Sequence, residues 1–169
     1  MRLRRILAVL LMASACPVIA QTPRDDPDYK ESDAPAAPAF EASRVIPFDV
    51  SAASALRFGV DPQTMSISKD GIVRYVVVAR SSSGTINAMF EGIRCSSGEF
   101  KTYARYNPGS GWNQVADPQW VAMISNRNSS HAYQLSRQGA CPEGGTPNRV
   151  DDVVRELLRP NSRGGVYPF

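Results

Sequence analysis

Histidine and cysteine are scarce in this sequence of 169 residues, which contains one histidine, His131, and three cysteines. If a signal peptide ending at Ala20 removes Cys16, two cysteines and one histidine remain, too few for a closed zinc site with four His or Cys ligands. Any Ser-His-Asp or Cys-His arrangement would have to use His131, and no Gly-x-Ser-x-Gly nucleophile motif accompanies it. We therefore predict a non-enzyme with no catalytic residues, no metal site and no cofactor.

Long apolar runs are also missing, because the longest one is far shorter than the roughly 20 residues of a membrane-spanning helix. This run, residues 6–13, follows three arginines and precedes the small residue Ala20. The pattern predicts a signal peptide over residues 1–20, and hence an exported protein of the periplasm or outer membrane. An alternative cleavage before Cys16 would make this cysteine a lipid-bearing N-terminus, although Ala13 replaces the usual leucine. Membrane attachment is expected only if Cys16 is lipidated.

Net charge is small once the signal peptide is set aside. Without its three arginines, 16 of the 19 basic residues remain against 16 acidic ones. This balance gives no reason to expect a nucleic-acid partner. Most basic residues after residue 43 are arginines, which bind carboxylates and phosphates in a bidentate manner. Codon bias in a GC-rich genome is the simpler explanation for them.

Large apolar residues are few between residues 21 and 43, where Pro, Ala and Asp dominate. Such a segment buries too little surface to offset its ordering entropy, so we predict a disordered linker over residues 21–43. One α+β domain is expected over residues 44–160, followed by a C-terminal tail over residues 161–169.

The domain begins with short β-forming runs joined by tight turns. Asp70-Gly71 lies between two such runs and is a strong hairpin signal. The expected strands cover residues 45–50, part of 52–60, 64–68, 72–80, 85–95, 99–106 and 112–115. Ile86, Ala88 and Phe90 should share one face, with Met89 on the other. The sequence thus predicts an antiparallel β-meander sheet with Pro47 in an edge strand.

Helical periodicity follows in the last third of the chain. We predict one helix over residues 130–138, ending at Gly139, and a second over 150–158 with Asn148 as its cap. Cys95 and Cys141 are predicted to form a disulfide, since an even pair of cysteines in an exported protein favours one. This bond would staple the two C-terminal helices to the sheet.

Single polar residues give little sign of chemistry. We interpret His131 as a solvated or capping histidine, and Glu91 as a member of a structural ion pair with Arg74 or Arg94. A small hydrolase of unfamiliar type remains an alternative. It would need polar groups that converge in a pocket around His131, Glu91 or Asp117.

Aromatic residues and arginines gather on the second half of the predicted sheet. They could form a platform that binds a protein, a glycan or an anion, or they could simply be core packing and an ordinary solvated face. The residues of this possible binding surface are Arg74, Arg94, Arg105, Tyr103, Trp112 and Trp120.

Several stretches of the sequence resemble the cryptic neisserial protein-like family of uncharacterised secreted proteins. The most specific is FEGIRC at residues 90–95; others are VIPFDVSAA at 45–53, FGVD at 58–61, DGIVRY at 70–75 and DYKE at 28–31. Further matches are Arg80-Ser81 with Gly84, Trp112, and Asp117 with Trp120. The resemblance implies a proteobacterial envelope protein without assigned activity, and it supplies no catalytic residues.

A second, more general resemblance runs from Val60 to Trp112 and is to the surface-adhesin protein E type, which binds host matrix proteins. Taken together, the sequence predicts a non-enzymatic binding or structural module of the cell envelope. Its expected partner is an envelope protein or a cell-surface component, and a surface adhesin is the alternative.

Overall fold

The computed structural model describes residues 29–51, 53–124 and 130–159 of the chain. The predicted signal peptide, Cys16, the first part of the predicted linker and the C-terminal tail lie outside these residues. Among the described residues, no helix is long and apolar enough to cross a membrane.

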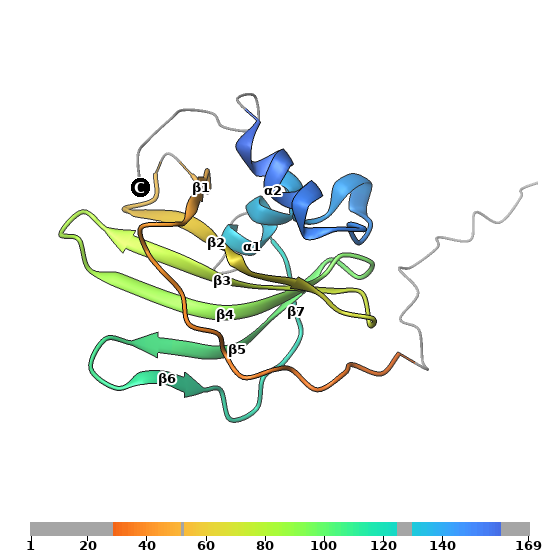
Figure 1. Ribbon diagram of the computed structural model, residues 1–169, viewed down its shortest axis with the longest axis horizontal. Helices are drawn as coiled ribbons and strands as arrows, with labels where there is room; N and C mark the ends of the chain where they lie inside the picture. The colour runs from red at the N-terminus through yellow and green to blue at the C-terminus, as the bar shows by residue number, and fades with distance from the viewer. Residues whose placement is uncertain (1–28, 52, 125–129, 160–169) are drawn as a thin grey trace, which may run out of the picture.

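An antiparallel sheet forms the middle layer of the domain (Figure 1). Neighbours in sequence are neighbours in the sheet from β1 to β6, and β7 pairs with the free end of β5. This confirms the predicted meander and places Pro47 in an edge strand. The strands are β1 (Ile46–Phe48), β2 (Leu56–Ile67), β3 (Ile72–Ser81), β4 (Ile86–Arg94), β5 (Glu99–Asn107), β6 (Gly111–Gln114) and β7 (Val121–Ala122).

Two irregularities in strand pairing were not predicted. The first lies in β2, which is one long strand where the sequence suggested two, and its register against β3 shifts between Asp61 and Ser66. The second is a β-bulge in β5: Phe90 faces Ala104, whereas the next residue, Glu91, faces Thr102. Tyr103 is therefore an extra residue in β5, and every residue beyond it changes face relative to a regular strand.

Two helices cover one face of the sheet (Figure 1). Helix α1 (Ser130–Leu135) continues into a wide turn, η1 (Ser136–Ala140), inside which Gly139 takes a φ of 146°. After η2 (Pro142–Gly144) comes α2 (Val150–Leu158), whose N-cap is Arg149 and not the predicted Asn148. The main core lies between these helices and one face of the sheet; its largest fully buried members are Tyr75, Ile93, Leu135 and Leu157.

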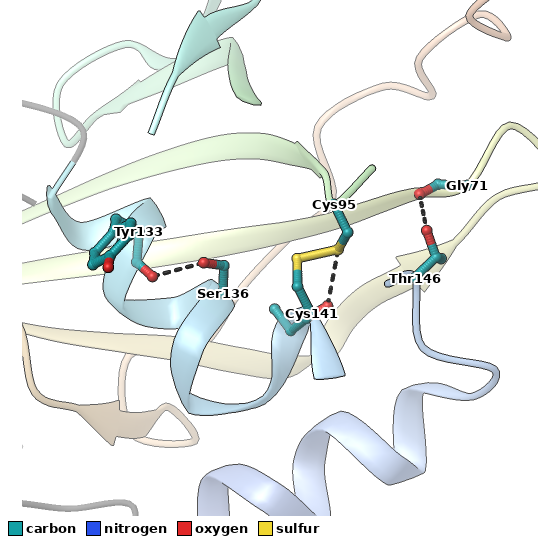
Figure 2. The surroundings of a disulfide bond; sticks show 7 residues. Gly71, Cys95, Tyr133, Ser136, Cys141 and Thr146 are labelled. Carbon is teal, nitrogen blue, oxygen red and sulfur yellow. Dashed lines mark hydrogen bonds between the residues drawn. A yellow bond between two sulfur atoms is a disulfide. The ribbon is translucent and has the colours of Figure 1, made fainter. Parts of the chain in front are cut away.

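The predicted disulfide joins Cys95, just after β4, to Cys141, just after η1 (Figure 2). The Cα atoms of the two cysteines lie 5.5 Å apart, within the usual range for a disulfide. Beside it, Thr146 Oγ1 donates to the carbonyl oxygen of Gly71 at 3.0 Å. The helical layer is therefore tied to the sheet at two neighbouring points.

The opposite face of the sheet is covered by the chain's own N-terminal segment, residues 29–41, which we call the strap. In Figure 1 it is the orange segment that crosses the strands. Ala37 and Phe40 of the strap pack on a second core that contains Val76, Phe90 and Tyr103. The predicted linker over residues 21–43 thus differs from the structure for residues 29–43, because specific side chains of the sheet hold this segment in place.

Candidate functional site

The strap covers five of the six residues predicted to form a binding surface. Its Glu31 carboxylate accepts hydrogen bonds from Lys101 Nζ at 2.5 Å, Tyr103 Oη at 2.8 Å and Trp120 Nε1 at 3.2 Å. Arg74 Nη2 lies 3.6 Å from the same carboxylate. A single strap side chain thus contacts three of the predicted surface residues, Arg74, Tyr103 and Trp120, together with Lys101.

Ser32 connects the strap to the β2–β3 turn. Its backbone N–H and hydroxyl both donate to Asp70 Oδ2, at 2.9 and 2.5 Å, and its carbonyl oxygen accepts from Arg74 Nη2 at 3.3 Å. Arg74 also pairs with Asp70 at 3.2 Å and is only 1% exposed. Arg74 is therefore a buried structural cation and not part of an exposed surface.

Aromatic packing holds the C-terminal half of the strap. Trp112 Nε1 donates to the Pro38 carbonyl oxygen at 3.1 Å, and the Phe40 ring meets the rings of Tyr106 and Trp112 edge-on. Beyond the strap, Arg44 forms a two-point ion pair with Asp61, which is fully buried. The contacts of Pro38 and Phe40 thus fill the aromatic platform with part of the chain itself.

Two carboxylates at the strap have lowered pKa values. Burial alone would raise the pKa of Asp70, but hydrogen bonds from Ser32 and Ser68 and the Arg74 guanidinium outweigh it and hold the pKa well below its usual range. Burial alone would also raise the pKa of Glu31. The hydrogen bonds from Lys101 and Tyr103 and the charge of Lys101 outweigh it and lower the pKa.

We expect acid to loosen the strap. A carboxylate whose pKa is lower in the folded than in the unfolded state stabilises the folded protein. This stabilisation is fully present when the pH is above the unfolded-state pKa, about 4 for Asp and Glu, and is lost as the pH falls through the folded-state pKa. The free energy of unfolding should therefore fall between about pH 5 and pH 2. Asp70→Asn should flatten this fall, whereas Asp117→Asn, at an exposed position, should not. Urea titrations followed by tryptophan emission measure this, and equal slopes for both variants would contradict it.

A pocket opens on the other face of the sheet, beside α1. Its volume is about 680 Å³, within the range of small-molecule sites. The walls combine apolar side chains from the 50–58 segment and from β4 and β5 with a few polar groups. The lining residues are Val50, Ser51, Ala53, Ser54, Leu56, Phe58, Ala79, Asn87, Met89, Glu91, Phe100, Thr102, Arg105, Ser130 and His131.

A buried polar cluster lies at the base of this pocket. Glu91 Oε2 lies 2.9 Å from His131 Nε2 and accepts from Tyr75 Oη at 3.2 Å, while Thr102 Oγ1 donates to Glu91 Oε1 at 3.1 Å. The His131 ring is stacked on Phe58 and meets Phe100 edge-on, with centroids 5.6 and 5.7 Å away. The Glu91 carboxylate thus fixes the position of the His131 ring through its Nε2 atom.

These positions correct two expectations from the sequence. His131 is buried and hydrogen-bonded, not solvated or a cap. Glu91 pairs with His131, because alternation along β4 and β3 points it away from Arg94 and Arg74. Asp117 is exposed and hydrogen-bonds Gln119, outside the pocket. Two of the three residues named as candidates for a hydrolase site, His131 and Glu91, therefore meet in one pocket.

Arg105 is separated from the other predicted surface residues. Arg74, Arg94, Tyr103, Trp112 and Trp120 all contact or lie beside the strap; Arg94, for example, lies 4.5 Å from the Tyr29 ring centroid. The bulge at Tyr103 turns Arg105 to the opposite face, where it pairs in register with Met89 and lines the pocket. Regular alternation would have placed it with the others.

Sequence reasoning assigned no role to the side chains of Glu31 and Thr102, and it placed Asp70 only in a hairpin turn. The DYKE stretch at residues 28–31 was a usable signal, because its resemblance to a family of folded domains argued against a disordered linker. No local pattern marked Thr102, whose partner Glu91 lies in another strand.

The site and fold define an α+β sheet domain with one face closed by its own chain and a pocket on the other. The sequence profile of the CNP1-like family matches residues 24–158, which include the strap, the sheet and both helices. The chain therefore belongs to the CNP1-like family, as the resemblance at residues 90–95 predicted. No curated protein sequence and no solved structure matches the chain significantly.

Proposed function

We propose that this protein is an exported, non-enzymatic binding module of the bacterial envelope, and that it holds a small ligand in the pocket beside α1. The observation that carries the proposal is the pocket of about 680 Å³ with the Glu91–His131 pair at its base. Apolar walls around a few well-placed polar groups are the usual composition of a ligand site. The signal-like N-terminus and the disulfide support export to the periplasm or outer membrane.

The strap supports a ligand site in the pocket, because it already occupies the opposite face of the sheet. It fills the aromatic platform that the sequence suggested as a binding surface, since its contacts there satisfy Lys101, Tyr103, Trp112 and Trp120. The pocket face keeps polar and aromatic groups around a space that the described chain leaves open.

Filling the pocket should weaken ligand binding without unfolding the protein. Asn87 is exposed and lines the pocket from β4, so Asn87→Trp places an indole in the ligand volume. We expect the Kd of a neutral apolar probe, N-phenyl-1-naphthylamine, to rise at least tenfold in a fluorescence titration. Gln114→Trp adds the same indole at an exposed position of β6 outside the pocket and should leave the Kd unchanged. Failure of the wild-type protein to bind the probe, or equal Kd values for both variants, would refute the proposal.

A hydrolase is the second candidate, and the Glu91–His131 contact favours it. A carboxylate that fixes an imidazole tautomer is the usual support of a histidine general base. In such an enzyme the His131 imidazole would be the general base for a water molecule that attacks an ester bound in the pocket. Hydrolysis of p-nitrophenyl esters distinguishes the two candidates. Turnover above the buffer rate that is lost in His131→Asn would establish the enzyme, and no such turnover would leave the binding module.

A further inference from the structure

Arg105 is the exposed charged residue among those that line the pocket. It is exposed, and its contact within the described part of the chain is Nη1 to Met89 Sδ at 3.2 Å. A thioether is a weak acceptor, and a guanidinium carries five N–H donors. Arg44, Arg74 and Arg94, by contrast, each pair with a carboxylate. Arg105 therefore has donors in the fork geometry that matches a carboxylate or phosphate.

Glu91, the carboxylate that lines the pocket, does not pair with Arg105. Glu91 is fully buried, and both of its oxygens are engaged by Tyr75, Thr102 and His131. No ion pair between Glu91 and Arg105 occurs among the described contacts. The accessible charge of the pocket is thus positive and lies beside apolar walls formed by Leu56, Phe58 and Phe100.

We propose that the ligand of this pocket is an amphipathic anion whose carboxylate or phosphate group pairs with Arg105 and whose apolar part lies against Phe58 and Phe100. This inference rests on the proposed binding function and specifies its ligand class. Charge complementarity selects an anion, and the apolar walls select a molecule with a substantial hydrocarbon part. A small inorganic anion leaves these walls uncovered and should bind weakly.

The test compares three ligands with the same chain length: decanoate, decyl phosphate and decanol. Each is used to displace N-phenyl-1-naphthylamine from the full mature protein at low and at high salt. We expect at least one of the two anions to bind tenfold or more tightly than decanol, with a difference that shrinks in high salt. Preference between the two anions identifies carboxylate or phosphate as the recognised group.

Arg105→Gln should remove this preference while leaving decanol binding unchanged. The matched control is Arg137→Gln, at an exposed position of η1 outside the pocket, and it should behave like the wild type. Equal affinity of the wild type for decanol and both anions, or an unchanged preference in Arg105→Gln, would overturn the anion inference and leave the binding module standing. If neither the probe nor any of the three ligands binds, the proposed function fails as well.

Discussion

Replacing residues 29–41 by a Gly-Ser segment of equal length should abolish cooperative unfolding of the domain. The replaced strap supplies the Glu31 carboxylate, two backbone polar groups of Ser32 and the Pro38 carbonyl. Without them Lys101 and Arg74 lose carboxylate contacts at positions with little access to water, and removing one partner of a buried ion pair costs roughly 3–5 kcal/mol. Losses of this size compare with the whole stability of a domain, about 5–15 kcal/mol.

A milder change tests the same contact without removing the segment. Glu31→Gln keeps the size of the side chain but removes the charge that faces Lys101, so we expect a loss of roughly 2 kcal/mol in the free energy of unfolding. Asp33→Asn is the matched control, because Asp33 lies in the strap and is exposed. Both tryptophans of the sequence contact the strap, so urea unfolding followed by their emission reports directly on it.

The strap prediction can fail in a clear way. A disordered linker over residues 21–43 implies that the Gly-Ser replacement leaves the unfolding transition and the tryptophan emission maximum as they are in the unmodified protein. That result, or equal effects of Glu31→Gln and Asp33→Asn, would show that the strap contacts contribute nothing to stability.

Reduction of the Cys95–Cys141 bond is expected to destabilise the protein by about 4 kcal/mol. The two cysteines are 46 residues apart, and the chain-entropy account assigns about this value to a loop of that length. For a domain of this size the melting temperature should fall by roughly 10 °C or more. Calorimetry with and without a phosphine reductant measures it, and the double variant Cys95→Ala, Cys141→Ala should be insensitive to the reductant.

Loss of the disulfide should destabilise the helical layer before it destabilises the whole domain. The bond joins the end of β4 to the turn after α1, so its loss frees the helical layer that carries His131. Amide exchange should accelerate first in residues 130–158, and only later in β3 and β4. An unchanged melting temperature after reduction, with both thiols shown to be free by alkylation, would contradict this prediction.

The meander could be predicted because its signals are local. Turn residues such as Asp70-Gly71 mark the hairpins, and period-two alternation correctly separated Ala88 and Phe90 from Met89. The disulfide followed from the number of cysteines and the expected compartment. Each of these inferences needs only residues close in sequence, or a pair with a single possible partner.

The strap and the polar cluster depend on contacts that no local pattern records. Glu31 reaches Lys101 and Tyr103 across about 70 residues, and it lies in a segment whose composition is that of a linker. His131 and Glu91 are 40 residues apart, and the FEGIRC stretch that contains Glu91 carries no sign of a histidine partner. A segment held by a few individual side chains has no periodicity, so composition alone assigns it to disorder.

The extra residue at Tyr103 determines which face of the sheet the following residues of β5 occupy. Because of it, Tyr103 and Ala104 both lie over the strap-side core, and Arg105 falls on the ligand side. A single-codon deletion there would keep every side chain of the pocket in the protein and yet move its cation to the closed face. Spacing along β5, rather than residue identity, thus decides whether the cavity carries a charge.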